Sequence, residues 1–312
     1  MTIVLALIAS LFIGVSDFLG GSVSRTRSPL ETSLVLFLAA LVTLVPIAFL
    51  LGASDLTGHD LGLGAVSGLT TSVAYVGFFA AIGHGRISIV APISAAVTAL
   101  LPAIAGIAEG NTLSTIARCG ILCALLAIPL VAYEIDDGET GDDWSTTRQV
   151  LVSILCGVGF GFYFFCIGHT SRSAGLWPTV ASLIVGIAVI APIAARDGVM
   201  PTLATLSRPA VAGGVALGVA DSALTTALQR GPLTVASVLG NLYPLVTITL
   251  GVTVLKERVR LWHAAGILLA VAGHCPPAII ATPAAASRIP AACQIRMRSP
   301  STVTPSAIVT SG

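Results

Sequence analysis

The sequence predicts an all-α polytopic membrane protein with about ten transmembrane helices, arranged as two inverted five-helix repeats. Three observations carry this prediction: the composition, a series of apolar runs of helical length, and a likeness between the two halves of the chain. Of the 312 residues, 55% are hydrophobic and 9% are charged, with a mean hydropathy of +0.98. Soluble domains contain about 25% charged residues, so these side chains are too apolar to cover a water-facing surface.

The apolar runs are long enough to cross a bilayer as helices. A transmembrane helix needs roughly 20 apolar residues, and cutting the chain at charged and turn-forming residues leaves about ten such runs. They lie at 3–22, 32–52, 61–83, 87–108, 113–133, 149–168, 177–195, 209–229, 232–255 and 261–281. No basic segment precedes the first run, so we interpret it as a retained span and not as a cleaved signal.

The two halves of the chain resemble each other on either side of an acidic, polar segment. The matched pairs are Gly14 with Gly159, Arg27 with Arg172 and Ser28 with Ser173 at an offset of 145, and Gly64 with Gly214 and Gly68 with Gly218 at an offset of 150. Such internal similarity indicates a duplicated unit. Since each half has an odd number of spans, the second half enters the membrane from the opposite side, which makes the repeats inverted.

This pattern divides the chain into four parts. Residues 1–133 form the first five-helix repeat, 134–148 a polar linker and 149–281 the second repeat. The remaining segment, 282–312, is rich in Pro, Ser, Thr and Ala, and we expect it to be disordered.

Two aspartates lie inside apolar runs, where a charged side chain costs about 2.5–3.5 kcal/mol on insertion scales. Asp17 shares a helical face with Gly14 and Gly21, and Asp221 shares one with Gly214 and Gly218. Small residues at this spacing let helices approach closely, so each aspartate is expected in a helix interface or a cavity. Two interpretations remain open: an ion- or substrate-responsive group, or a polar residue hydrogen-bonded to a neighbouring helix.

The run at 232–255 carries a proline near its start. Pro244 has no N–H, so the carbonyl of Gly240 loses its helical partner and the helix is expected to kink. Broken helices occur in membranes where protein or a cavity satisfies the freed backbone groups. For Tyr75 and Tyr243, substrate binding and plain packing both remain open. The expected pathway residues are Asp17, Asp221, Asn241, Tyr243, Tyr75 and Ser16, with Pro244 as the kink.

Known catalytic and cofactor motifs do not occur in the sequence. It has no P-loop, no G-x-S-x-G and no H-E-x-x-H pattern, and its histidines are scattered. The cysteines stand without accompanying His or carboxylate clusters, so neither a metal site nor a cofactor is expected. A net charge of +1 gives no general attraction to nucleic acid. The sequence therefore does not predict an enzyme.

Several stretches of the second half carry a family likeness. They are "GVAD" at 218–221, "GPLTVASVLGNLYPLVTITLGVTVLKERV" at 231–259 and "AAGILLAVAGH" at 264–274. The chain resembles the EamA family of the drug/metabolite transporter superfamily in these stretches. The likeness includes Leu242-Tyr243-Pro244 early in the ninth run and Glu257-Arg258 after its end. The stretch "SIVAPISAAVTALLPAIAGIAEGNTLS" at 88–114 is similar to the fourth helix of that family's first repeat.

The resemblance implies a secondary transporter that moves a small organic metabolite or drug across the plasma (inner) membrane by alternating access. Its expected partners are the solute, the lipid bilayer and coupled protons or ions, and a homodimer is left open. The alternatives are a membrane subunit without transport of its own, structural or regulatory, and a lipid-handling membrane protein. The solute and the direction of transport are left open.

Two arguments about orientation disagree. The resemblance implies that both termini are cytoplasmic. Most Lys and Arg residues near span ends, such as Arg25, Arg86 and Lys256, follow odd-numbered runs, and the positive-inside rule would place the N-terminus outside. The orientation therefore stays open.

Overall fold

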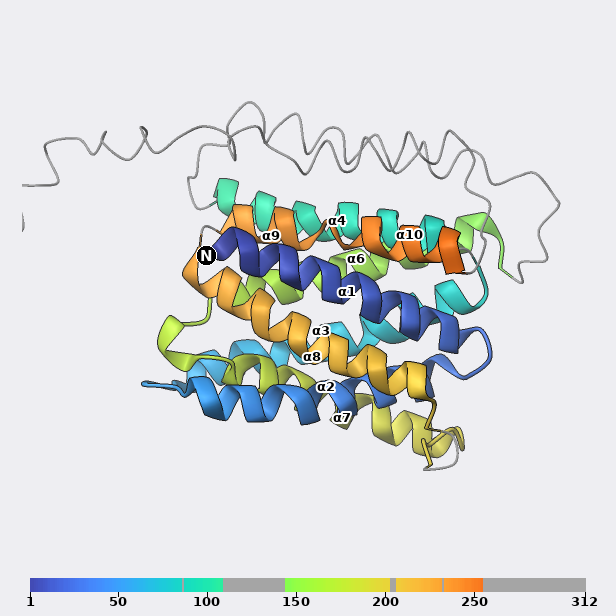
Figure 1. The fold of residues 1–312 in the computed structure, drawn as a ribbon, viewed down its shortest axis with the longest axis horizontal. Helices are drawn as coiled ribbons and strands as arrows, with labels where there is room; N and C mark the ends of the chain where they lie inside the picture. The colour runs from blue at the N-terminus through green and yellow to red at the C-terminus, as the bar shows by residue number, and fades with distance from the viewer. Residues whose placement is uncertain (86, 109–143, 203–205, 232, 255–312) are drawn as a thin grey trace, which may run out of the picture. The chain divides into compact units, whose positions relative to one another are not determined.

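The computed structural model describes residues 1–85, 87–108, 144–202, 206–231 and 233–254, which form helices and no strand (Figure 1). The first repeat contributes α1 (Thr2–Ser24), α2 (Pro29–Leu51), α3 (Gly58–Gly83) and α4 (Ile87–Ala108). The second repeat contributes α6 (Thr146–Gly168), the 3-10 turn η1 (Arg172–Ala174), α7 (Trp177–Arg196), α8 (Arg208–Arg230), α9 (Leu233–Gly240) and α10 (Tyr243–Val254).

Parts of the sequence prediction lie outside the described residues. These are the spans at 113–133 and 261–281, most of the polar linker, the tail at 282–312 and the charged triplet after residue 255. The total of ten spans therefore stays a prediction. The described helices begin and end within a few residues of the predicted runs, except in the ninth.

Most of the described helices are long and apolar enough to cross a membrane. Seven segments qualify among the described residues: α1, α2, α3, α6, α7, α8 and the stretch Val235–Val254. Their exposed side chains are largely apolar, as with Val42, Val73 and Leu155, of which 74%, 67% and 70% are accessible. Soluble proteins place polar groups at such positions, whereas lipid accepts apolar ones. The chain is therefore a multi-pass membrane protein.

The third helix of each repeat packs against the second helix of the other repeat. Helix α3 lies along α7, and α8 lies along α2. The close contacts are Gly64 with Pro178 and Gly68 with Ser182 between α3 and α7, and Gly214 with Leu36 and Gly218 with Ala40 between α8 and α2. A Cβ atom at Gly214 would lie 2.6 Å from the Leu36 carbonyl oxygen. The small-residue faces of the sequence thus form equivalent interfaces between the two repeats.

Helix α1 lies beside α8, α9 and α10 (Figure 1). At Gly14 a Cβ atom would lie 2.7 Å from the Tyr243 carbonyl oxygen, and Thr247 Oγ1 donates to the Gly14 carbonyl at 3.3 Å. Helix α4 packs on α6, where Thr98 Oγ1 donates to the Gly157 carbonyl at 3.2 Å. These contacts join the first and fourth helices of one repeat to helices of the other.

The ninth predicted span is two helices and not one kinked helix. Helix α9 ends at Gly240, residues 241 and 242 form a turn, and Pro244 is the second residue of α10. Proline is well tolerated in the first turn of a helix because that N–H has no intrahelical partner. At the break, the backbone N and side-chain Nδ2 of Asn241 both donate to the Ser237 carbonyl, at 3.0 and 2.8 Å.

Candidate functional site

A cavity lies where helices of both repeats meet. Its lining comes from α1, α2, α3 and α4 of the first repeat and α6, α7, α8 and α10 of the second. The volume open to the centre of a water-sized sphere is ≈ 40 Å³. This volume holds a few water molecules and is well below the roughly 300–1,000 Å³ of pockets for drug-sized ligands. The cavity is nearly closed in this conformation.

The lining combines acidic, aromatic, hydroxyl and aliphatic side chains. It consists of Asp17, Asp221, Tyr75, Tyr163, Tyr243, Phe37, Phe160, Phe164, Thr71, Thr98, Thr179, Ser182, Ile13, Leu183, Leu217 and Leu224. None of these residues is Lys, Arg or His. The part of the lining that the structure describes therefore holds two carboxyl groups and no basic side chain.

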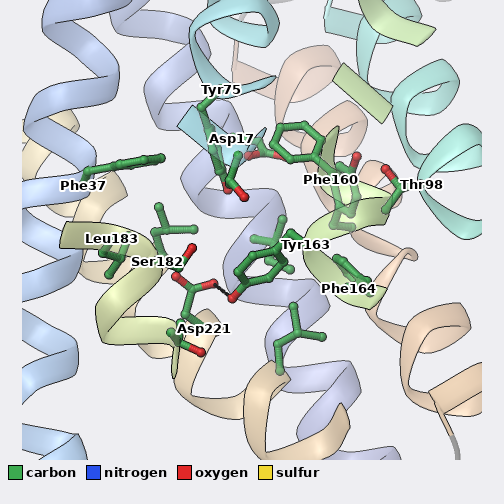
Figure 2. A pocket seen from close by; sticks show the side chains of 16 residues that line it. Asp17, Phe37, Tyr75, Thr98, Phe160, Tyr163, Phe164, Ser182, Leu183 and Asp221 are labelled. Atoms are coloured by element: carbon green, nitrogen blue, oxygen red, sulfur yellow. Dashed lines mark hydrogen bonds between the residues drawn. The ribbon is translucent and has the colours of Figure 1, made fainter. Parts of the chain in front are cut away.

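Asp221 is held by a neighbouring helix of its own repeat. The Tyr163 hydroxyl on α6 donates to Asp221 Oδ1 on α8 at 3.2 Å, as Figure 2 shows. Only 7% of Asp221 is exposed. One turn earlier, Gly218 packs against Ala40 of α2. The close contact with α2 and the Tyr163 bond together direct Asp221 toward the cavity.

Asp17 has no such support. Its exposed fraction is 3%, and its carboxyl oxygens accept no hydrogen bond among the described residues. The same helix packs tightly through Gly14 on α10 and through Gly21, where a Cβ atom would lie 2.9 Å from Ile82 of α3. Figure 2 shows the carboxyl group directed into the cavity. A buried carboxylate without a partner is costly, so a proton or a cation at this point would lower that cost.

Three aromatic rings form a continuous wall of the cavity. The Tyr75 ring meets Phe37 with centroids 5.3 Å apart and Phe160 with centroids 4.9 Å apart, both near edge-to-face. Edge-to-face packing orients aromatic rings against each other. These rings come from α3, α2 and α6, so the wall joins both repeats.

Hydroxyl pairs connect the helices around the cavity. Tyr243 Oη on α10 lies 3.2 Å from Ser94 Oγ on α4, and Thr179 Oγ1 on α7 lies 2.6 Å from Thr225 Oγ1 on α8. The first pair links the two repeats, and the second links two helices of the second repeat. Both are buried. They fix the positions of helices that contribute lining residues.

The sequence-predicted site residues separate into two groups. Asp17, Asp221, Tyr75 and Tyr243 line the cavity. Two further residues, Ser16 and Asn241, are buried but are not lining residues. Within the described part of the chain, Ser16 Oγ and Asn241 Oδ1 are buried without a hydrogen-bond partner. Pro244 lies just after the helix break.

Tyr163 and the phenylalanines of the lining were not selected by sequence reasoning. Tyr163 lies in the stretch "GFGFYFF", where neighbouring aromatic residues occupy every side of α6. A helix that is apolar all round shows no preferred face. The hydrogen bond to Asp221 depends on contact between α6 and α8, which no local pattern reveals.

The end of the bundle where α2 ends and α3 begins is tied together by an acidic side chain. Asp60 accepts hydrogen bonds from Ser171 N at 2.7 Å and Ser171 Oγ at 2.9 Å. It also accepts from Thr57 N at 3.3 Å, while Asp60 N donates to Thr57 Oγ1 at 3.1 Å, and these two bonds form a capping box at the start of α3. Nearby, Ser54 N donates to the Ser173 carbonyl at 3.0 Å. We call the Asp60–Thr57–Ser171 cluster the Asp60 latch.

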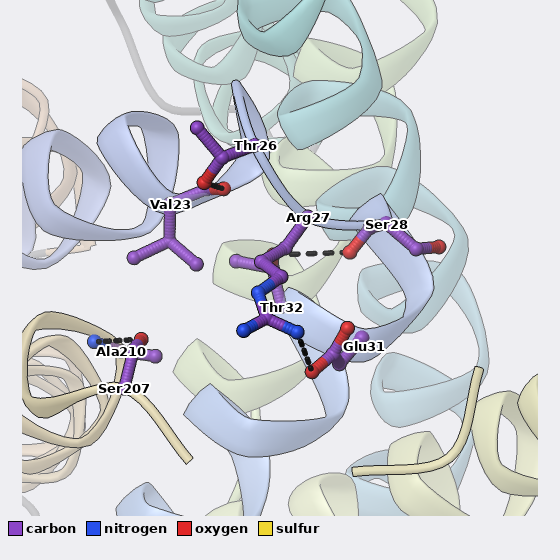
Figure 3. A network of polar contacts seen from close by, with 8 residues as sticks. All are labelled: Val23, Thr26, Arg27, Ser28, Glu31, Thr32, Ser207 and Ala210. Atoms are coloured by element: carbon purple, nitrogen blue, oxygen red, sulfur yellow. Dashed lines mark hydrogen bonds and ion pairs between the residues drawn. The ribbon is translucent and has the colours of Figure 1, made fainter. Parts of the chain in front are cut away.

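The repeat-related positions at the other end form no equivalent of the Asp60 latch. At the offsets that relate the repeats, Asp60 corresponds to Ala210 and Ser171 to Thr26. Thr26 Oγ1 donates to the Val23 carbonyl at 3.2 Å, within its own segment. Figure 3 shows this local bond, and the Ser207–Ala210 cap apart from it.

The repeat-related arginines differ in the same way. Arg172 Nε donates to the Gln229 carbonyl at 2.6 Å, near the end of α8. Its counterpart Arg27 lies 3.8 Å from Glu31, an i,i+4 neighbour (Figure 3). At the latch end, therefore, side chains bridge separate segments, whereas at the other end these side chains bond locally.

Comparison with known proteins agrees with this architecture. The sequence pattern of the EamA-like transporter family matches residues 1–133 and again residues 143–275. No curated protein sequence matches the chain significantly. Several solved structures are similar, among them a crystal structure of a protein with a TM-score of 0.65 and 16% identity over 89% of this chain and 97% of that chain. At this identity the likeness concerns the fold alone. Because the family pattern occurs twice, once on each repeat, the chain belongs to the EamA-like transporter family, within the drug/metabolite transporter superfamily.

Proposed function

We propose that this protein is a secondary transporter that moves a small organic solute across the plasma (inner) membrane by alternating access between its two repeats. The observation that carries the proposal is the cavity with two buried carboxyl groups at the interface of the repeats. Membership of the EamA-like family supports it. Transporters built from inverted repeats commonly bind their solute at such an interface.

The packing of the repeats supports a rocking motion. Helices α3 and α7, and helices α8 and α2, meet through glycines whose contacts lie on backbone carbonyls. Backbone contact without interlocking side chains lets two helices slide by small amounts. The Asp60 latch closes one end in this conformation, and its release would open that end.

The carboxyl groups have separate tasks in this proposal. Asp17, which has no hydrogen-bond partner in the described structure, meets the solute or the coupling ion directly. Asp221 exchanges its Tyr163 bond for a proton or ion during the cycle. Tyr75 and Tyr243 bound the space beside them, and Ser16 and Asn241 are buried with oxygens that have no hydrogen-bond partner in the described structure.

Reconstituted proteoliposomes test the proposed transport. Vesicles are loaded with a mixture of amino acids, amines, nucleosides and sugars, and the solutes lost under an imposed pH gradient are identified by mass spectrometry. We expect at least one solute to leave faster than from protein-free vesicles.

The control is the Asp17→Asn/Asp221→Asn double variant, whose side chains keep the wild-type shape. We expect this variant to lose the solute flux while eluting as a folded protein. A wild-type protein that is folded and moves no solute in either direction would refute the transporter proposal.

A further inference from the structure

Most hydroxyl groups that line the cavity can only accept hydrogen bonds from a ligand. Thr71 Oγ1 donates to the Ser67 carbonyl at 2.6 Å, and Thr98 Oγ1 donates to the Ser94 carbonyl at 2.7 Å. Tyr163 donates to Asp221. A hydroxyl has one hydrogen and two lone pairs. Once the hydrogen is engaged by a protein oxygen, only lone pairs remain for a ligand.

Tyr243 is part of a series of two hydrogen bonds that runs through Ser94 to the Ala91 carbonyl. Ser94 Oγ donates to the Ala91 carbonyl at 3.1 Å, which leaves its lone pairs to accept from the Tyr243 hydroxyl at 3.2 Å. Among the lining side chains of the described structure, the hydroxyls of Tyr75 and Ser182 keep a hydrogen for a ligand, and in the Thr179–Thr225 pair either hydroxyl could be the donor. With two carboxyl groups and no basic side chain, the cavity offers many acceptors and few donors.

The aromatic wall adds attraction for positive charge. The faces of Phe and Tyr rings carry negative potential, and cations within about 6 Å of a ring centre are attracted to them. Phe37, Tyr75 and Phe160 form this wall, and Asp17 projects into the same cavity. A carboxyl group beside several rings is an arrangement that recognises ammonium groups.

We propose that the solute of this site is a small organic cation, whose ammonium group lies beside Asp17 and against the Phe37–Tyr75–Phe160 wall. The proposal rests on the proposed transport function and names the class of solute carried. The second carboxyl group, Asp221, accepts from Tyr163 in this conformation and adds a second acidic group, which favours cations at the site. The ammonium group supplies the partner that Asp17 does not have in the described structure.

The same lining disfavours anions and zwitterions. The carboxylate of an anion or an amino acid would be buried near two carboxyl groups, and no basic residue among the described lining residues would receive it. Such unpaired like charges in a buried site cost several kcal/mol. Selection therefore comes from repulsion of negative groups as well as from attraction of the ammonium group.

The test compares choline with its neutral isostere, 3,3-dimethylbutan-1-ol, in which carbon replaces the quaternary nitrogen. Both have the same shape, and choline is small enough to suit a cavity that must widen from ≈ 40 Å³. Purified protein in a maltoside detergent is titrated with each compound, and the shift in melting temperature is followed. Maltoside is required because phosphocholine detergents carry the same head group.

We expect choline to stabilise the protein at concentrations at least about tenfold lower than its isostere, since the charge and the ring contacts contribute more than 1.4 kcal/mol. Betaine, which adds a carboxylate to the same head group, is expected to bind more weakly than choline. Equal shifts for choline and the isostere, or no shift with choline, would overturn the cation site.

Variants locate the binding. Asp17→Asn is expected to abolish the preference for choline over the isostere, whereas Asp55→Asn, the same change at an exposed carboxyl outside the cavity, is expected to preserve it. Loss of the preference in both variants would overturn the assignment to Asp17. The wild-type comparison decides the cation class even if Asp17→Asn fails to fold.

The outcomes for the cation site and for transport are separable. If proteoliposomes move other solutes while choline neither binds nor moves, the cation inference is wrong and the transporter proposal stands. If choline binds through Asp17 and no solute crosses the membrane, the cation site stands and the transporter proposal is wrong.

Discussion

The three tyrosines that line the cavity differ in the hydrogen-bond partner of their hydroxyl groups. Tyr163 donates to Asp221, Tyr243 donates to Ser94, and Tyr75 has no hydrogen-bond partner in the described structure. All three rings are buried. The same Tyr→Phe change therefore removes a bond at two positions and none at the third.

Tyr163→Phe is expected to destabilise the protein by about 1–3 kcal/mol, because it leaves the buried Asp221 carboxyl without its donor. Tyr243→Phe is expected to cost about 0.5–1.5 kcal/mol, the contribution of a neutral bond. Tyr75→Phe is the control and should leave stability close to wild type. Denaturant titration in detergent, followed by circular dichroism, measures the three differences. A loss for Tyr75→Phe as large as for Tyr163→Phe would contradict this account.

Neighbouring residues on a helix face different directions, and this bears on two of the predicted pathway residues. Successive side chains on an α-helix are separated by about 100°. Because Asp17 faces the cavity, the adjacent Ser16 points elsewhere, and it is buried outside the lining. Asn241 lies in the turn between α9 and α10, where its Nδ2 bonds the Ser237 carbonyl. The polar Asn241 therefore lies at the helix break, near the lining residue Tyr243, and does not itself line the cavity.

At the scale of elements, the glycines of α3 test the contact between the repeats. A Cβ atom at Gly64 would collide with the Pro178 carbonyl of α7, whereas a Cβ atom at Gly62 would meet no atom within 4 Å. Both positions lie in the same helix. The pair therefore separates the effect of helix propensity from the effect of packing.

Gly64→Ala is expected to destabilise the protein by about 1–3 kcal/mol, since overpacking against backbone forces the helices apart. Gly62→Ala is expected to be neutral or to stabilise by up to about 1 kcal/mol, because alanine favours a helix more than glycine does. The melting temperatures of the two variants in detergent provide the comparison. Similar shifts at the two positions would show that α3 and α7 do not meet at Gly64.

The form of the break between α9 and α10 could not be predicted from the local sequence. Pro244 predicts that the helix is disturbed near Gly240. It does not determine whether the helix bends or stops. Helix α10 is held by Thr247 against Gly14 of α1 and by Tyr243 against Ser94 of α4. Both contacts join α10 to helices of the other repeat, and they occur together with the division of the span into two helices.

At the scale of the whole molecule, the two ends of the repeat architecture are unequal. The Asp60 latch and Arg172 bridge separate segments at one end, and their repeat-related counterparts, Ala210 and Arg27, do not. Alternating access requires each end to open in turn. Since the latch holds one end by several hydrogen bonds, opening that end requires breaking them.

Asp60→Asn is expected to raise the population open at the latch end. Each lost hydrogen bond contributes about 0.5–1.5 kcal/mol, and 1.4 kcal/mol corresponds to a tenfold change in an equilibrium. The measurement is the rate at which a water-soluble maleimide labels Ser182→Cys, a cavity position, in a cysteine-free background. We expect the rate to rise roughly tenfold with Asp60→Asn.

The control for this measurement is Asp55→Asn, an exposed carboxyl in the same loop region, which should leave the labelling rate unchanged. An unchanged rate in Asp60→Asn, with the variant folded, would show that the latch does not restrict access to the cavity.

The sequence by itself determined the membrane class, the repeat and the two carboxyl groups. Composition and run length report how much of the chain must avoid water, and Asp17 and Asp221 are conspicuous because charge inside an apolar run is costly. Tertiary structure alone decided which groups meet: Tyr163 with Asp221, the rings around Tyr75, and Asp60 with Ser171. These pairs join segments far apart in the chain. The local sequence shows that a charged side chain lies in an apolar run, where its burial is costly. Its hydrogen-bond partner depends on how helices distant in the sequence pack together.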